Sequence, residues 1–129
     1  LCLLVATFDP INLTLDAYVP AYTALTGRQI SAADLYDAGT RAYNLQKAFN
    51  SRLGYTRKDD TVCWRWLNEP VPSGPGKGMK VGDYLEQCLD EYYEFKGWDR
   101  ASGLQRRDTL ERLGLQDVAE VLAREQGLA

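Results

Sequence analysis

The sequence contains no histidine, and only three of its 129 residues are cysteines. Histidine is the commonest general base and a common metal ligand, so its absence argues against a self-contained catalytic site. Cys2, Cys63 and Cys88 stand far apart and form no C-x-x-C pair. An odd number of separated cysteines without a secretory signal favours reduced thiols and a cytoplasmic protein. We expect Cys63 and Cys88 to be small buried hydrophobic side chains.

The sequence also lacks long apolar runs and stretches in which apolar and polar residues alternate. No run approaches the ~20 apolar residues of a membrane-spanning helix, so no membrane span is expected. Fifteen Lys and Arg against eighteen Asp and Glu give a net charge of −3, which argues against a nucleic-acid-binding surface. No stretch alternates as a half-buried strand does, so no sheet is expected. The hydrophobic fraction of 45% is typical of a globular chain, and the length of 129 residues predicts one domain.

The most regular pattern lies between Ser31 and Gly54. Apolar residues recur there at spacings of three and four, on one stripe of a helix: Leu35, Ala38, Ala42, Leu45, Phe49 and Leu53. Ser31 and Asp34 have the spacing of a capping box, and Gly54 stands where a left-handed residue would end the helix. We expect this stripe to face the core, so that Phe49→Ala would cost on the order of 3–5 kcal/mol.

Shorter helical patterns occupy residues 15–26, 62–69, 84–96, 109–113 and 116–124. Pro20 should kink or restart the first of these helices, and Asp83 is expected to cap the third. Residues 70–78, PVPSGPGKG, predict a loop, and a rigid connector is favoured over a phosphate cradle because no strand precedes it. The expected fold is an all-α, compact domain of about five helices packed around the long central helix, without a sheet.

Two charged stretches are candidates for chemistry. Residues 56–60, TRKDD, hold two basic and two acidic side chains, and a solvated loop is the favoured interpretation. The segment 84–97 carries four carboxylates, and these are Glu86, Asp90, Glu91 and Glu94. Paired carboxylates can perform acid–base chemistry, but on the outer face of an amphipathic helix we expect them only to be solvated.

The first eight residues, LCLLVATF, form an apolar run that begins abruptly. The run lacks the basic segment that opens a secretory signal. Apolar runs are normally buried, so we expect the chain to be a piece of a longer protein. A processed terminus and a partner-binding strand are the alternatives.

Several strings occur in a recognisable order: NLQKAFNSRLGYTRKDDTVCWRWLNEPVPSGPGKG, LDEYYEFKGWD and LERLGL. Together they resemble the carboxy-terminal domain of the tungsten-containing aldehyde:ferredoxin oxidoreductases. That family has a helix of the form N-x-x-x-x-F-N, then G-[FY]-T-R-K-D-D, a short aromatic helix, a Pro/Gly loop ending in K-G, and L-D-E-Y-Y. The likeness covers about residues 44–115. It implies that residues 1–129 are the helical carboxy-terminal domain of a larger enzyme, with residues 1–8 facing the missing cofactor domains.

The resemblance also implies a role for the first three residues. The family's D-x-x-G-[LIV]-C motif ends in the fourth cysteine ligand of a [4Fe-4S] cluster, and Leu1 and Cys2 match its last two positions. By this resemblance Cys2 is a metal ligand, and Leu1 and Leu3 line the tungstopterin. No residue is assigned a catalytic role. Because the other cluster cysteines and the tungsten-binding domain are absent from the sequence, we expect neither cofactor nor activity in the isolated chain.

The resemblance implies a cofactor-supporting domain of an enzyme that oxidises aldehydes to carboxylic acids and passes electrons to ferredoxin. The expected partners are the amino-terminal and middle domains of the same protein, ferredoxin and a small aldehyde, with a homodimer left open. The choice between tungsten and molybdenum also stays open. The alternative is a stand-alone helical interaction module that binds a partner through LCLLVATF and exposed tryptophans.

Overall fold

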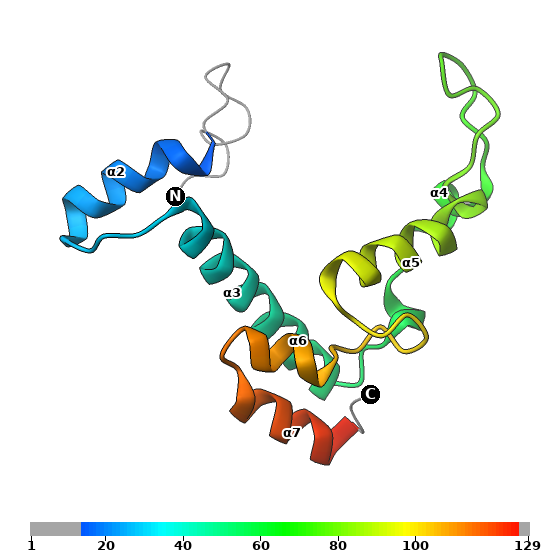
Figure 1. Cartoon of the computed structure of the whole chain (residues 1–129). Coiled ribbons are helices and arrows are strands. Elements are labelled where there is room, and N and C mark those ends of the chain that lie inside the picture. The colour runs from blue at the N-terminus through cyan, green and yellow to red at the C-terminus, as the bar shows by residue number, and fades with distance from the viewer. Residues whose placement is uncertain (1–13, 127–129) are drawn as a thin grey trace. The chain divides into compact units, whose positions relative to one another are not determined.

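The computed structural model describes residues 14–126, which hold six α-helices, two 3-10 helices and no strand (Figure 1). The α-helices are α2 (Leu15–Thr26), α3 (Ala32–Arg52), α4 (Trp64–Asn68), α5 (Leu85–Lys96), α6 (Arg107–Arg112) and α7 (Gln116–Gln126). The 3-10 helices are η1 (Arg57–Asp59) and η2 (Val81–Asp83). The expected all-α class is confirmed. None of the helices in this part of the chain is long and apolar enough to cross a membrane.

The chain divides into two units, residues 1–43 and 44–129, and the boundary falls inside α3. The described part of the first unit contains α2 and the first half of α3. Gly27, with φ of +70°, ends α2. Helix α2 continues through Pro20, so the helix is not restarted there. A proline removes only one backbone donor, and α2 has helical residues on both sides to hold it.

The start of α3 matches the predicted capping box. The Ser31 hydroxyl accepts a hydrogen bond from the Asp34 backbone at 3.1 Å, and the Asp34 carboxylate accepts one from the Ser31 backbone at 2.7 Å. Hydrogen bonds from Ser31 lower the pKa of Asp34 below its usual value. The predicted end of the helix is also confirmed, because Gly54 follows with φ of +92°.

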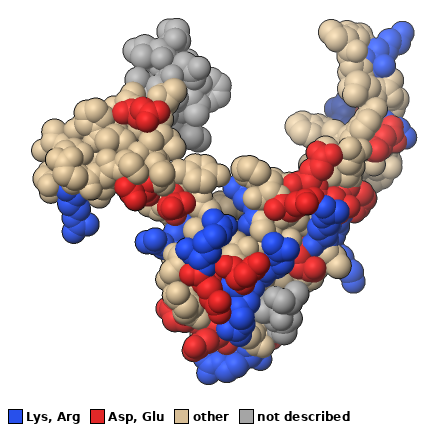
Figure 2. Space-filling model, in the orientation of Figure 1, with Lys and Arg blue, Asp and Glu red and all other residues tan. Residues whose placement is uncertain are grey.

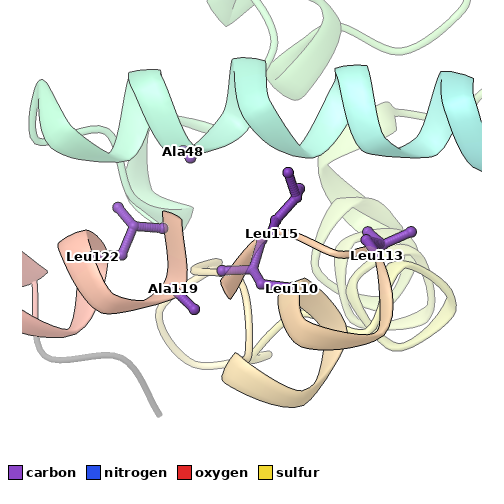
Figure 3. Packing of buried hydrophobic residues seen from close by; sticks show 6 residues of the cluster. All are labelled: Ala48, Leu110, Leu113, Leu115, Ala119 and Leu122. Carbon is purple, nitrogen blue, oxygen red and sulfur yellow. The ribbon is translucent and has the colours of Figure 1, made fainter. Parts of the chain in front are cut away.

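The second unit has a hydrophobic core where the last turns of α3 meet α6 and α7 (Figure 3). Six buried residues form it: Ala48, Leu110, Leu113, Leu115, Ala119 and Leu122. Gly114, with φ of +72°, turns the chain between α6 and α7. Leu115 and Leu122 are buried in this core, whereas Val118 and Val121 are half-buried.

The face that α3 turns inward is not the predicted apolar stripe. Its buried residues are Asn44, Lys47, Ala48 and Ser51. Phe49 is 62% exposed, so the prediction that it belongs to the core is wrong. Small side chains such as Ala48 allow neighbouring helices to approach closely, and Asn44 and Lys47 find polar partners in the neighbouring segments.

The 3-10 helix η2 packs against both α4 and α5, and the loop 70–78 joins α4 to η2. The loop is confirmed, and it is closed by hydrogen bonds from the Val71 backbone to Met79 and from the Gly78 backbone to Val71, at 3.0 and 2.9 Å. A Cβ on Gly82 would lie 2.4 Å from the Leu67 carbonyl oxygen. The close approach of η2 to α4 therefore requires glycine at this position.

Two expectations about this region are wrong. Asp83 does not cap α5; it lies in η2 and pairs with Lys80 at 3.2 Å, and Tyr84 is the capping residue. Cys63 and Cys88 are both exposed. Cys88 stands five residues before the buried Tyr93, which places it well away from the inward face of α5. Cys63 is the residue that precedes α4, at a helix end.

Leu110→Ala should lower the free energy of unfolding by about 2–5 kcal/mol because Leu110 is fully buried in the core. Phe49→Ala should change it by less than about 1 kcal/mol, since the side chain is largely exposed. Urea unfolding of the 129-residue chain measures both. A larger loss for Phe49→Ala than for Leu110→Ala would contradict the inward face of α3 described above.

Candidate functional site

A polar network centred on Arg57 joins η1 to α5 and to the segment 98–105. The guanidinium donates to the Glu86 carboxylate at 2.6 and 3.2 Å and to the Asp90 carboxylate at 2.6 Å. It also donates to the backbone carbonyl of Arg100 at 2.6 Å. Hydrogen bonds with Glu86 and then Asp90 raise the pKa of Arg57, which keeps it charged. The side chain is only 17% exposed, so its paired carboxylates replace most of its water.

The backbone around Arg57 is held so that its side chain reaches α5. Thr56 and Asp59 form a second capping box, in which the Thr56 backbone donates to the Asp59 carboxylate at 2.8 Å. The Arg57 backbone donates to the Ser102 carbonyl at 2.8 Å. Gly103 has φ of +72°, and a Cβ there would lie 3.0 Å from the Arg57 nitrogen and 3.1 Å from the Tyr93 hydroxyl. Only glycine lets this loop approach η1 so closely.

Asp60 holds the second half of the network. One oxygen of its carboxylate accepts hydrogen bonds from the Tyr93 hydroxyl at 2.5 Å and from the Lys47 ammonium at 3.2 Å. The Lys47 nitrogen lies 5.0 Å from the centre of the Trp98 ring. Tyr93 is 1% exposed. Its burial, together with the hydrogen bond to Asp60, raises the pKa of Tyr93 and keeps the phenol neutral.

Asn44 ties α3 to the same segment. Its side-chain oxygen accepts a hydrogen bond from the Trp98 indole at 3.0 Å, and its backbone carbonyl accepts one from the Gln105 amide at 2.6 Å. All three side chains are buried.

Ser102 donates to the Asp99 carboxylate at 2.6 Å through its hydroxyl and at 2.7 Å through its backbone, and these bonds lower the pKa of Asp99.

The interpretation of TRKDD as a solvated loop is therefore wrong for Arg57 and Asp60, which are half-buried and paired. Glu86 is exposed, as expected, and Asp90 is half-buried, but both also pair with Arg57. Their charges are paired across elements 29 to 33 residues apart in sequence. On the face shown in Figure 2, basic and acidic side chains lie interspersed over the second unit. Between residues 14 and 126 no group of three or more His, Cys, Asp or Glu side chains could hold a metal. The network positions segments, and it offers no nucleophile or metal site.

An apolar groove of about 240 Å³ lies between the second half of α3 and α7. Its lining residues are Leu45, Ala48, Phe49, Arg52, Asp117, Val118, Val121 and Leu122. At its edge, Arg52 donates two hydrogen bonds to the Glu125 carboxylate at 2.6 and 3.2 Å. The groove thus combines apolar walls with a charge pair that is satisfied within the chain.

The three residues assigned by the sequence resemblance, Leu1, Cys2 and Leu3, lie outside the described residues. Their assignment as metal ligand and pterin-lining residues stays a prediction. The residues that sequence reasoning missed are the members of the network. The spacing of Thr56 and Asp59, which is that of a capping box, was the one local signal for an ordered turn there.

Comparison with protein families gives a match over residues 1–115 to the family model described as aldehyde ferredoxin oxidoreductase, domains 2 and 3. Curated relatives include the tungsten-containing aldehyde ferredoxin oxidoreductases of Pyrococcus furiosus, 34% identical, and Thermococcus kodakarensis, 35% identical, each over 111 residues. Each alignment covers 85% of this chain and 18% of the relative. The chain therefore spans less than a fifth of the length of these relatives.

Among solved structures, the chain resembles the active-site complex BamBC of benzoyl coenzyme A reductase in complex with 1,5-dienoyl-CoA. The TM-score is 0.72 and the sequence identity is 25%. The likeness covers 92% of this chain and 16% of that chain. The same arrangement of helices is thus present as a small part of a much longer polypeptide.

Arg57→Lys should lower the melting temperature of the 129-residue chain. A lysine keeps the charge but cannot donate at once to Glu86, Asp90 and the Arg100 carbonyl in the fixed geometry of a guanidinium. Arg65→Lys is the matched control, because Arg65 is 78% exposed and meets only Glu69 on the next turn. Equal melting temperatures for the two variants would show that the Arg57 network does not support the fold.

Tyr93 should remain protonated until the chain unfolds. Its pKa is raised above the ordinary value of 10.0, so its contribution to stability is complete below about pH 10 and is lost as the pH rises further. At about pH 11, Tyr93→Phe should leave the phenolate absorbance of the folded chain unchanged and reduce that of the urea-unfolded chain by one tyrosine. A loss of absorbance in the folded state would mean that Tyr93 ionises there.

Proposed function

Because the chain belongs to the aldehyde ferredoxin oxidoreductase family, within the part described as domains 2 and 3, we propose that it is a helical, cofactor-supporting domain of such an enzyme. The observation that carries the proposal is the match over residues 1–115. The 34–35% identity to tungsten-containing members supports tungsten as the metal of the whole enzyme. The proposed reaction is the oxidation of an aldehyde to a carboxylic acid, with electrons passed to ferredoxin.

The chain's own contribution is proposed to lie in its first three residues. Cys2 would supply one thiolate to a [4Fe-4S] cluster, and Leu1 and Leu3 would form part of the apolar wall around the tungstopterin and substrate. Cluster irons are usually held by four cysteine thiolates, and the exposed Cys63 and Cys88, at α4 and in α5, belong to no group of three or more metal-ligating side chains among residues 14–126. The remaining thiolates would come from another part of the enzyme. When bound, the pterin and the cluster supply the redox chemistry.

The second unit is proposed to be a structural part of the enzyme rather than a source of cofactor ligands. The second unit forms a rigid support, because Arg57, Asp60 and Asn44 connect α3, η1, α5 and the segment 98–105 through buried or half-buried hydrogen bonds. The proposed partners are the other domains of the same enzyme, which make up most of the length of the relatives, together with ferredoxin and a small aldehyde.

A second candidate follows from the solved structure. The similarity to the benzoyl coenzyme A reductase complex favours a reductase that acts on an aromatic acyl-CoA. The sequence identity is 25% in that comparison and 34–35% with the aldehyde oxidoreductases, so aldehyde oxidation is the preferred function. Assays of the intact enzyme with ferredoxin and either an aldehyde or benzoyl-CoA distinguish the two.

Cys2→Ser in the intact enzyme tests the cluster assignment. Loss of one thiolate should lower the iron content, about four atoms per polypeptide for one cluster, or shift the reduction potential of the cluster, and electron transfer to ferredoxin should fall. Cys88→Ser is the control, because this exposed cysteine is assigned no ligand role. Full iron content, an unshifted potential and unchanged electron transfer in Cys2→Ser would refute the assignment and leave Cys2 as an apolar side chain without a ligand role.

A further inference from the structure

The apolar residues that α3 leaves outside the core of the second unit form one face. Leu45, Phe49 and Leu53 follow one another at intervals of four, and they are 44%, 62% and 62% exposed. Residues at this spacing lie on the same side of a helix. Across the groove, α7 presents the half-buried Val118 and Val121. We name the surface made by Leu45, Phe49, Val118 and Val121 the α3–α7 groove.

Folding of the second unit does not account for the α3–α7 groove. The core is closed by Ala48, Leu110, Leu122 and their neighbours without Phe49. An exposed phenylalanine forgoes the favourable free energy of burying its apolar ring. A contiguous apolar surface with a large aromatic side chain at its centre is typical of a binding site, in which such residues act as anchors.

The edge of the groove indicates what it binds. Arg52 and Glu125 neutralise each other through two hydrogen bonds, so the ligand has no need to bring a charge to either. With a volume of about 240 Å³, the groove can take a few apolar side chains. Apart from the paired Arg52 and the single carboxylate of Asp117, the lining residues are apolar, so the groove fits an apolar protein segment and offers little to a nucleic acid.

We propose that the α3–α7 groove receives an apolar segment from the remaining part of the same enzyme, an inference that rests on the proposed function. In the curated relatives and in the similar solved structure, the matched region is 18% and 16% of the chain. Most of each polypeptide is thus tethered to this domain. A tethered segment has an effective concentration of the order of mM, which a second copy in free solution does not reach. Because it is covalently attached, a segment of the same enzyme is favoured over a second copy of the chain as the occupant of the groove.

The experiment compares Phe49→Ser with Phe49→Leu, in the intact enzyme and in the 129-residue chain. Hydrogen exchange of the amides of residues 44–53 and 116–126 is measured in each. In the intact enzyme, Phe49→Ser should accelerate this exchange at least about tenfold, and Phe49→Leu, which keeps an apolar anchor, should not. In the 129-residue chain, both variants should exchange at rates within about threefold of the parent, because the side chain is exposed there.

Two results would overturn the proposal. One is exchange in the intact enzyme that Phe49→Ser leaves unchanged. The other is an intact enzyme whose dimer, measured by analytical ultracentrifugation at micromolar concentration, becomes monomeric in Phe49→Ser, since the groove would then bind a second copy. Iron content keeps this test separate from the cluster assignment: a failed Cys2 assignment leaves the exchange result standing, and unchanged exchange leaves the iron result standing.

Discussion

The pairing of Arg57 and Asp60 with α5 is the constraint on which the second unit depends. The described residues bury only nine hydrophobic side chains, so apolar packing alone connects few of the elements. Arg57 fixes η1 against α5 and the Arg100 backbone, while Asp60 joins Tyr93 to Lys47 of α3. Charged groups with several partners tolerate few alternative arrangements, since each alternative leaves a desolvated group without its hydrogen bonds.

This constraint explains why α3 turns a partly polar face inward. Lys47 and Asn44 must face Asp60 and Trp98 to satisfy their hydrogen bonds. Ala48 and Ser51 lie on the same side of the helix and are small. Once these four residues are turned inward, Phe49 and Leu53 are carried to the outside by the geometry of the helix. The exposed apolar face is thus a consequence of the polar network.

The sequence predicted the helices well because their signals are local. The Ser31–Asp34 box and the glycines that end α3 and α5 act within one turn, and the periodicity marked where helices lie. The inward face of α3 could not be predicted, since it is set by partners 13 to 61 residues away. A periodic stripe shows that a helix has an apolar side, and it does not show whether this domain or another one covers it. The ligand role of Cys2 is predicted only by the resemblance, because a lone thiol carries no spacing signal.

Within the short string NLQKAFN, residues on the two faces of α3 have different roles. One face packs inside the second unit, and the other is exposed. Asn44 points inward and holds Trp98 and Gln105, whereas Phe49, five residues later, lies on the exposed side. Asn44 therefore acts on the stability of the domain itself, and under the proposal made above for the α3–α7 groove, Phe49 acts on its fit to the rest of the enzyme. A domain with a small core of its own can still be well held in a large enzyme if such an outer apolar face is buried by its neighbours. On this view, the residues on one helix that fold the domain differ from those that dock it.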